Sequence, residues 1–395
     1  MNRSNASLAA ETSPTRPSGA APLPARASAA ALGLLAAFLL SGCYVLGEGS
    51  AYLSLLAKAT PVSRLLEDPA IAPSRRAFLE RVLDVRKFGI EVLGLKDTKN
   101  YTTLVEIEGD RIATVVQACA ELSFDRYLWN YPVVGRLPYK GFFESEGANR
   151  EAARLKAEGW DVIVRGVDSF STLGWFSDPL FSFMESYGEA ELAELVLHEM
   201  THATAFSKRE GPFNEELATF VGRKGAEAYL GRRGAADALA AYRSARSEEA
   251  AFAAFVAETA AELDAVYRSA ADPAEKRLEK ARIIAVRAEA YRATLASGFS
   301  SEGRREFPMG KINNAFIDLY ALYEGEPRLY EDYLAAACGG DLRLFIERAA
   351  AAAKGRGDPK EALKAGLSVP RAKTLEVAPK LAIIGEEGLR NAPEE

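Results

Sequence analysis

Apolar residues recur at helical spacing through the second half of the chain, from residue 190 onward. A repeat of three to four residues places apolar side chains on one face of a helix, and interruptions of the repeat mark the helix ends. The pattern predicts helices over residues 190–207, 214–230, 309–324 and 328–354, and two long helices within 234–296 that are broken near Asp272-Pro273.

The first half of the chain mixes helical and strand patterns. Helical spacing of apolar residues predicts helices over residues 74–95 and 146–158. Runs rich in β-branched and aromatic residues predict strands over residues 101–107, 112–118 and 160–167. The first two strands flank Glu108-Gly109-Asp110, which predicts a β-hairpin.

These elements predict an α+β fold that is mainly α, with a small β-sheet ahead of the helix over residues 190–207. We expect one folded domain over residues 71–355, with its strands within about 71–185 and its helical part within about 186–355. After Gly355 the chain is charged and interrupted by prolines. We therefore expect residues 356–395 to be loosely ordered.

The N-terminal region has the pattern of a targeting segment. Three arginines precede an apolar run over residues 27–40, which is too short to span a bilayer as a mature helix. The run ends in Leu-Ser-Gly-Cys at residues 40–43, which resembles the lipobox of bacterial lipoproteins. The resemblance implies a signal peptide over residues 1–42 and a lipidated Cys43 that begins a tether and first helix over residues 43–70.

A lipid on Cys43 would attach the protein to a membrane of the cell envelope, at the outer membrane or the periplasmic face. Two alternatives stay open. The leader can be removed by an ordinary signal peptidase, or it can remain as an uncleaved anchor with an incidental cysteine.

Composition narrows the class of protein. Of the 395 residues, 48% are hydrophobic, which is enough for a sizeable core, and the formal net charge is -6. An acidic balance without a basic cluster disfavours nucleic acid as a partner. Besides Cys43 the chain has Cys119 and Cys338, which either pair or are buried free thiols. No Cys-x-x-Cys motif supports a cysteine-based zinc or redox site.

The main chemical motif is His-Glu-x-x-His at residues 198–202. On a helix His198 and His202 lie one turn apart on the same face, so both imidazoles can bind one zinc ion. Glu199 points about 100° away around the helix and can act as a general base on water. The chain has only these two histidines. The structural alternative is a pair of surface histidines on an amphipathic helix.

Two histidines leave a catalytic zinc site one protein ligand short. Glu215 and Glu216 follow Asn214, which after Pro212 is a good N-cap for the next helix. Adjacent residues on a helix cannot both face the metal. The position directly after the predicted N-cap favours Glu215 over Glu216.

The motif His-Glu-Met-Thr-His followed by Asn-Glu-x-x-Ala resembles the gluzincin metallopeptidases. The resemblance implies a gluzincin-like helical catalytic domain in which His198, His202 and Glu215 are zinc ligands and Glu199 is catalytic. Twelve residues separate His202 from Glu215, against about eighteen in the better-known gluzincins. This spacing implies a shorter connection and a more compact site.

Most of the chain from Cys43 to about Ala350 also resembles bacterial lipoproteins that are described as predicted aminopeptidases. The resemblance is carried by the segments at residues 61–69, 135–143, 171–179, 312–315 and 320–323.

Motif and resemblance together predict a zinc-dependent peptidase that hydrolyses peptide bonds by Glu199-assisted attack of zinc-bound water. The family resemblance implies an aminopeptidase. Two alternatives stay open: a zinc endopeptidase of the cell envelope, and a non-catalytic helical binding or scaffold lipoprotein.

Several other residues are candidates for the site. The strand over residues 160–167 can offer an edge to an extended peptide, and the loop over residues 172–179 can line the cleft or plug the core. Candidate oxyanion donors, each with core packing as its alternative, are Tyr139, Tyr320 and Tyr323. Candidate carboxylates for binding the amine of an aminopeptidase substrate are Glu144, Glu146, Asp178 and Glu185.

Overall fold

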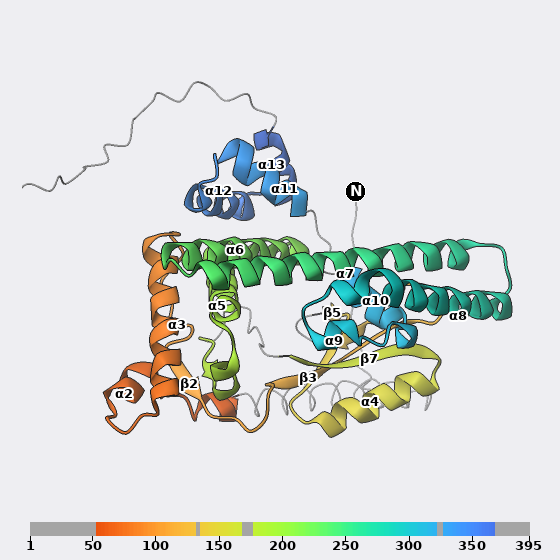
Figure 1. Cartoon of the computed structure of the whole chain (residues 1–395), viewed down its shortest axis with the longest axis horizontal. Coiled ribbons are helices and arrows are strands. Elements are labelled where there is room, and N and C mark those ends of the chain that lie inside the picture. Colours follow the sequence, from red (N-terminus) through yellow and green to blue (C-terminus); the bar gives the residue numbers. More distant parts are fainter. Residues whose placement is uncertain (1–52, 132–134, 168–176, 322–326, 368–395) are drawn as a thin grey trace, which may run out of the picture.

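The computed structural model describes residues 53–131, 135–167, 177–321 and 327–367 (Figure 1). Helices make up most of this part of the chain and the strands form only small sheets, so the predicted α+β, mainly α class is confirmed. The leader with Cys43, Tyr323 and residues 172–176 of the predicted loop over 172–179 lie outside the described residues.

Three helices build the part of the fold that carries the histidine motif: α3 (Pro73–Glu91), α5 (Glu189–Thr204) and α6 (Gly211–Arg232). Their apolar faces meet in the largest hydrophobic core. α5 and α6 pack closely because α6 has glycine at the crossing. A Cβ on Gly222 would lie only 2.8 Å from the carbonyl oxygen of Glu194.

The strands form two three-stranded sheets and one hairpin. In the first sheet β2 lies between an antiparallel and a parallel neighbour, and in the second β3 pairs antiparallel with strands on both sides. The first sheet has the order β1 (Thr60–Pro61), β2 (Thr103–Val105), β8 (Leu180–Phe181); the second has the order β6 (Lys140–Phe142), β3 (Ala113–Ala120), β7 (Trp160–Val167); the hairpin joins β4 (Trp129–Tyr131) and β5 (Gly135–Leu137). Helix α4 (Ser145–Ala157) covers one face of the second sheet.

The predicted hairpin around Glu108-Gly109-Asp110 is wrong. β2 and β3 flank this segment but belong to different sheets. Leu104 is buried in the core around α3 and α5, whereas Val116 is buried under α4. β3 starts in the same core as β2, at Ala113, and continues into the core under α4. The turn therefore carries the chain from one sheet to the other instead of closing a hairpin.

Helices α7 (Ala236–Arg268) and α8 (Pro273–Ala290) form a long antiparallel arm (Figure 1). The predicted break at Asp272-Pro273 is confirmed. Asp272 caps α8 by accepting from the N–H groups of Ala274 and Glu275, and Pro273 begins the helix. A second core, rich in aromatic residues, joins this arm to α10 (Asn314–Ala321). The smaller elements here and near the N-terminus are α2 (Val62–Glu67), α9 (Glu302–Arg305), a π-helical turn at Tyr291–Leu295, and 3-10 turns at Ser182–Ser186, Ala296–Gly298 and Met309–Lys311.

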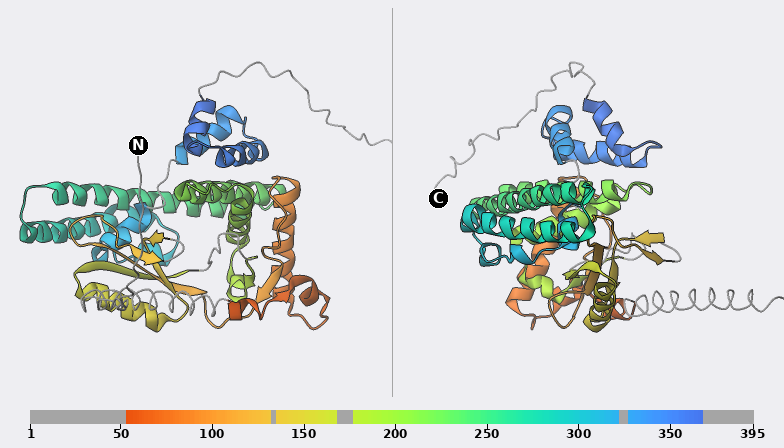
Figure 2. Two further views of the ribbon diagram at one scale, coloured as in Figure 1. Left: turned by 180° about the vertical axis from the view of Figure 1, so that it is seen from behind. Right: turned by 90° about the vertical axis from the view of Figure 1, so that its right-hand side faces the viewer.

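The C-terminal unit, residues 327–367, lies on the outer side of α6 in Figure 1 and in both views of Figure 2. It contains α11 (Pro327–Asp332), a π-helical turn (Tyr333–Ala337), α12 (Leu342–Lys354) and α13 (Pro359–Leu367). The single helix predicted over residues 328–354 is wrong, because Gly339 and Gly340 adopt positive φ and end the first segment. Residues 359–367, expected to be loosely ordered, form α13, whose Leu363 is buried in the main core.

Two of the three cysteines lie within the described residues. Cys119 and Cys338 are both buried free thiols. Burial, together with the nearby Asp318 carboxylate, raises the pKa of the Cys119 thiol to about 12, so this group stays protonated. No helix within the described ranges is long and apolar enough to cross a membrane.

Candidate metal centre

Helix α5 presents His198 and His202 on the face that turns toward the start of α6. The opposite face buries Leu192, Val196 and Met200 in the core, which fixes the rotation of the helix. The two Nε2 atoms lie 3.1 Å apart. The spacing of four residues therefore brings both imidazoles to one point, as the motif predicts.

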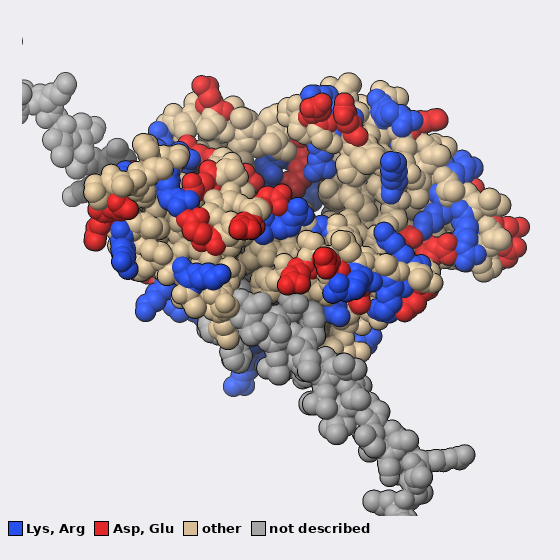
Figure 3. Space-filling view, turned by 90° about the horizontal axis from the view of Figure 1, so that it is seen from below, with Lys and Arg blue, Asp and Glu red and all other residues tan. Residues whose placement is uncertain are grey.

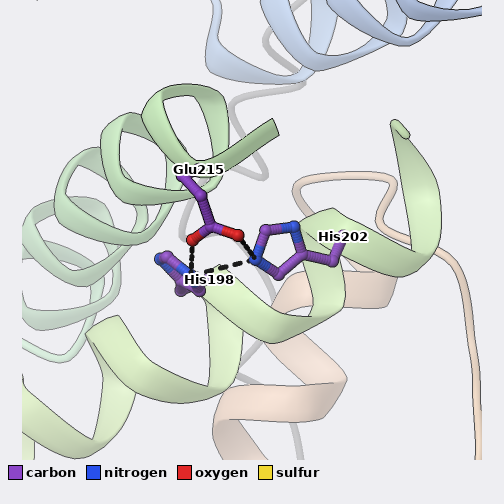
Figure 4. A group of neighbouring side chains, drawn as sticks. All are labelled: His198, His202 and Glu215. Carbon is purple, nitrogen blue, oxygen red and sulfur yellow. Dashed lines mark hydrogen bonds and ion pairs between the residues drawn. The ribbon is translucent and has the colours of Figure 1, made fainter. Parts of the chain in front are cut away.

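Glu215 reaches the same point from α6 (Figure 4). Its Oε1 lies 3.6 Å from His202 Nε2, and its Oε2 lies 3.8 Å from His198 Nε2. Ligand atoms about 2.0 Å from a tetrahedral zinc ion are roughly 3.3 Å apart. Among the described residues, this triad is the group of His, Cys, Asp and Glu side chains whose ligand atoms converge closely enough to hold a metal ion. Two nitrogens and one carboxylate fit zinc with an open coordination position.

The start of α6 differs from the prediction. The helix begins at Gly211 with Pro212 in its first turn, and Glu210 is the N-cap, so the assignment of Asn214 as N-cap is wrong. Pro is favoured at the first helical position, where a missing N–H costs no hydrogen bond. Glu215 consequently lies in the second turn.

Asn214 has another role that the sequence analysis missed. Its side chain is buried; Oδ1 accepts from the N–H of Ser207 and Nδ2 donates to the carbonyl oxygen of Ser207, both at 2.8 Å. This pair of bonds closes the connection between the two helices. Asn214 thereby fixes the start of α6, and with it Glu215, relative to the end of α5.

The electrostatic environment keeps both histidines neutral. Burial lowers the pKa of His198 to about 3, with smaller contributions from His202 and Arg223. Burial also lowers the pKa of His202. Neutral imidazoles are the form that binds a metal ion, since ligation requires a free nitrogen lone pair.

Glu199 lies on the same helix and is not one of the three residues of the triad. Its side chain is only 6% exposed. Burial raises the pKa of its carboxyl to about 8, and the charges of Asp178 and Glu215 add to this shift. A divalent cation beside Glu199 would lower this pKa again and favour the carboxylate.

The residue after Glu215 has a different environment. The Glu216 side chain is 13% exposed and accepts from Lys360 Nζ at 2.8 Å and from the Tyr330 hydroxyl at 3.1 Å. In the connection before α6, Arg209 Nη1 donates to the carbonyl oxygen of Arg356 at 2.7 Å. The C-terminal unit therefore holds the chain on both sides of Glu215, and Glu216 is directed toward this unit.

This anchoring gives a prediction for stability. Lys360→Ala should lower the free energy of unfolding by about 2–4 kcal/mol, because it leaves the Glu216 carboxylate largely buried without its cation. Urea denaturation measures the change. Arg268→Ala is the matched control, since Arg268 pairs with Asp264 while 79% exposed and should contribute less than about 1 kcal/mol. Equal effects of the two substitutions would contradict the anchoring role.

The two candidate oxyanion donors among the described residues have other surroundings. Tyr320 lies in the aromatic core of the arm, where its hydroxyl accepts from Arg304 at 3.3 Å. Tyr139 is exposed between β5 and β6. Neither is brought into the triad, and no oxyanion donor follows from their positions. On the face seen from below, acidic and basic side chains are intermixed (Figure 3).

The fold and the triad define an α+β protein with a candidate metal centre between two packed helices. A family model described as "Putative aminopeptidase" matches residues 43–363, and the chain belongs to that family. Membership supports a peptidase function and a peptide substrate. No curated protein and no solved structure matches the chain.

Proposed function

We propose that this protein is a zinc-dependent aminopeptidase in which His198, His202 and Glu215 hold the metal and Glu199 is the general base. The observation that carries the proposal is the convergence of the three ligand atoms, which all lie within 4.8 Å of one another. The family match supplies the reaction class.

Zinc held by these residues would polarise a water molecule and the carbonyl group of the substrate. Glu199 accepts a proton from the attacking water and returns it to the leaving nitrogen. A divalent cation beside it would lower the raised pKa of this carboxyl and so favour the carboxylate form that a general base needs. Asn214 keeps the metal ligand on α6 opposite the two on α5.

We also propose that Cys43 is lipidated and attaches the protein to the cell envelope. The family match begins at Cys43, which supports a mature protein that starts there. A lipid anchor leaves the folded domain in the aqueous phase beside the membrane.

Metal analysis and peptide digestion test the proposed function. We expect about one zinc ion per chain, release of N-terminal residues from short peptides, loss of this activity with a chelator, and recovery on adding zinc. Hydrolysis that a chelator leaves unchanged would contradict the zinc mechanism. Equal cleavage of peptides with free and blocked N-termini would indicate an endopeptidase.

A further inference from the structure

A cluster of four charged side chains lies about one helical turn from the metal centre. Its members come from three helices: Glu194 from α5, Arg223 from α6, and Arg246 and Glu249 from α7. Glu194 precedes His198 by four residues, so both side chains leave α5 on the same face, separated by a rise of about 6 Å. These four residues form the charged cluster, which the sequence did not reveal because they are brought together only by helix packing.

Helix α6 places Arg223 beside this stretch of α5. The preceding residue, Gly222, faces the metal-binding turn: a Cβ on it would lie 3.2 Å from His198 Cβ and 2.8 Å from the carbonyl oxygen of Glu194. Arg223 follows at about 100° around the helix, and its Nε lies 3.5 Å from Glu194 Oε1. The Arg223 guanidinium is therefore held at the level of Glu194, next to the metal centre.

The other members of the charged cluster have closer partners than Arg223. The Tyr242 hydroxyl donates to Glu194 Oε2, and Arg246 Nη1 lies 2.7 Å from Glu249 Oε2. The charged cluster is nevertheless incomplete in its hydrogen bonding. Within the described part of the chain, the buried Nε of Arg246 has no hydrogen-bond partner.

Arg223 is the open member of the charged cluster. Its side chain is 44% exposed, more than that of the other three. It lies 3.5 Å from Glu194 and 3.6 Å from Glu249, and among the described residues its guanidinium donates no hydrogen bond. A guanidinium has five N–H donors in a planar fork that matches a carboxylate. Both the charge and the donors of Arg223 are thus available to a substrate.

The carboxylates that the sequence singled out for a substrate amine are not members of the charged cluster. Glu185 pairs with Arg75 at 2.6 Å. Glu146 is 87% exposed at the start of α4, and Glu144 is the N-cap residue of that helix. The charged cluster is a separate set of side chains, and its exposed member is a cation.

The distance of Arg223 from the metal centre suits the C-terminal end of a short peptide. In an aminopeptidase one residue of the substrate precedes the cleaved bond, so the rest extends from the metal toward the C-terminus. An extended peptide advances about 3.3 Å per residue. The rise of about 6 Å between Glu194 and His198 therefore corresponds to about two residues beyond the cleaved bond.

We propose that Arg223 binds the C-terminal carboxylate of the substrate and so favours peptides of about three or four residues. A guanidinium and a carboxylate form two parallel, charge-assisted hydrogen bonds, which are stronger than those between neutral groups. Held there, a short peptide presents its first peptide bond to Glu199 and the metal ligands. This inference rests on the proposed peptidase function and names the substrate class as short peptides with a free C-terminus.

The test compares Arg223→Gln with the wild-type protein on matched tripeptides with a free or an amidated C-terminus. The wild-type protein should prefer the free tripeptides. In Arg223→Gln we expect kcat/KM for the free tripeptides to fall by about 10- to 100-fold, mainly through KM, the range for a hydrogen bond to a charged group. The kcat/KM for the amides and the zinc content should change far less.

Two further variants complete the test. Arg223→Lys keeps the charge and loses the planar fork, so it should keep only part of the preference for a free C-terminus. Arg243 lies on α7 and pairs with Glu227 on α6 at 3.0 Å, so Arg243→Gln should leave the preference intact. Should Arg223→Gln fail to fold, Arg223→Lys decides: a reduced preference supports the assignment, and an unchanged one overturns it.

Equal losses on free and amidated tripeptides would overturn the assignment. A loss confined to amidated peptides with Asp in place of Asn at the third residue would also overturn it, because Arg223 would then bind an acidic side chain. A wild-type protein without zinc or peptidase activity would contradict the proposed function itself. An active zinc enzyme without the preference, or one whose preference survives Arg223→Gln, contradicts only this inference.

Discussion

Glu199→Gln should lower kcat for peptide hydrolysis by about 10²- to 10⁴-fold while zinc remains bound. Glutamine has nearly the same shape as glutamate but cannot accept and return a proton. Glu199 is buried on α5 and lies outside the ligand triad, so the substitution removes a base and no ligand. Initial rates on a short peptide with a free N-terminus, measured together with zinc content, distinguish a loss of catalysis from a loss of metal.

Glu191→Gln is a suitable control for this variant. Glu191 is an exposed residue in the first turn of the same helix, and its substitution should leave kcat unchanged. Full activity of zinc-loaded Glu199→Gln would show that another group accepts the proton. Loss of zinc from Glu199→Gln would instead make Glu199 a ligand.

The features that the sequence predicted correctly are those determined by local spacing. The repeat of apolar residues predicted α5 and the arm formed by α7 and α8 to within a few residues. Strand β7 has the predicted bounds, Trp160–Val167. The four-residue separation of His198 and His202 predicted their convergence, because helix geometry alone places them on one face.

The features that the sequence did not predict depend on contacts between distant segments. β2 pairs with β8, about 75 residues later in the chain, and not with the strand that follows it. Lys360 meets Glu216 across 144 residues. Hydrophobic periodicity carries no information on such pairings, since it specifies a buried face but not the partner that covers it.

The start of α6 was missed for a local reason. Asn214 and Pro212 are both residues found at helix starts, and the choice between them depends on where the preceding chain lies. Ser207 provides the partner that removes Asn214 from the capping role. The same buried contact positions Glu215, so the error in the helix boundary concealed a residue that shapes the site.

Glu215→Gln should weaken zinc binding by more than about 100-fold. Changing a residue that only supports a metal ligand costs about 10- to 100-fold in affinity, and Glu215 is proposed to be a ligand itself. The reason is that only the two imidazoles of the triad would then remain as strong ligands. The Glu215 side chain is 62% exposed, so the substitution should cost little folding free energy. Competition for zinc with a chromophoric chelator measures the affinity, and peptide hydrolysis should fall with it.

Glu216→Gln is the matched comparison, because the two glutamates are adjacent on α6 and differ in what they contact. We expect Glu216→Gln to bind zinc as the wild-type protein does and to unfold at lower urea, since Lys360 loses its charged partner. The reverse pattern, with zinc lost only in Glu216→Gln, would exchange the two assignments. If zinc binding survived both substitutions, neither Glu215 nor Glu216 would be a metal ligand. The proposed hydrolytic centre would then lack the third ligand that its geometry requires.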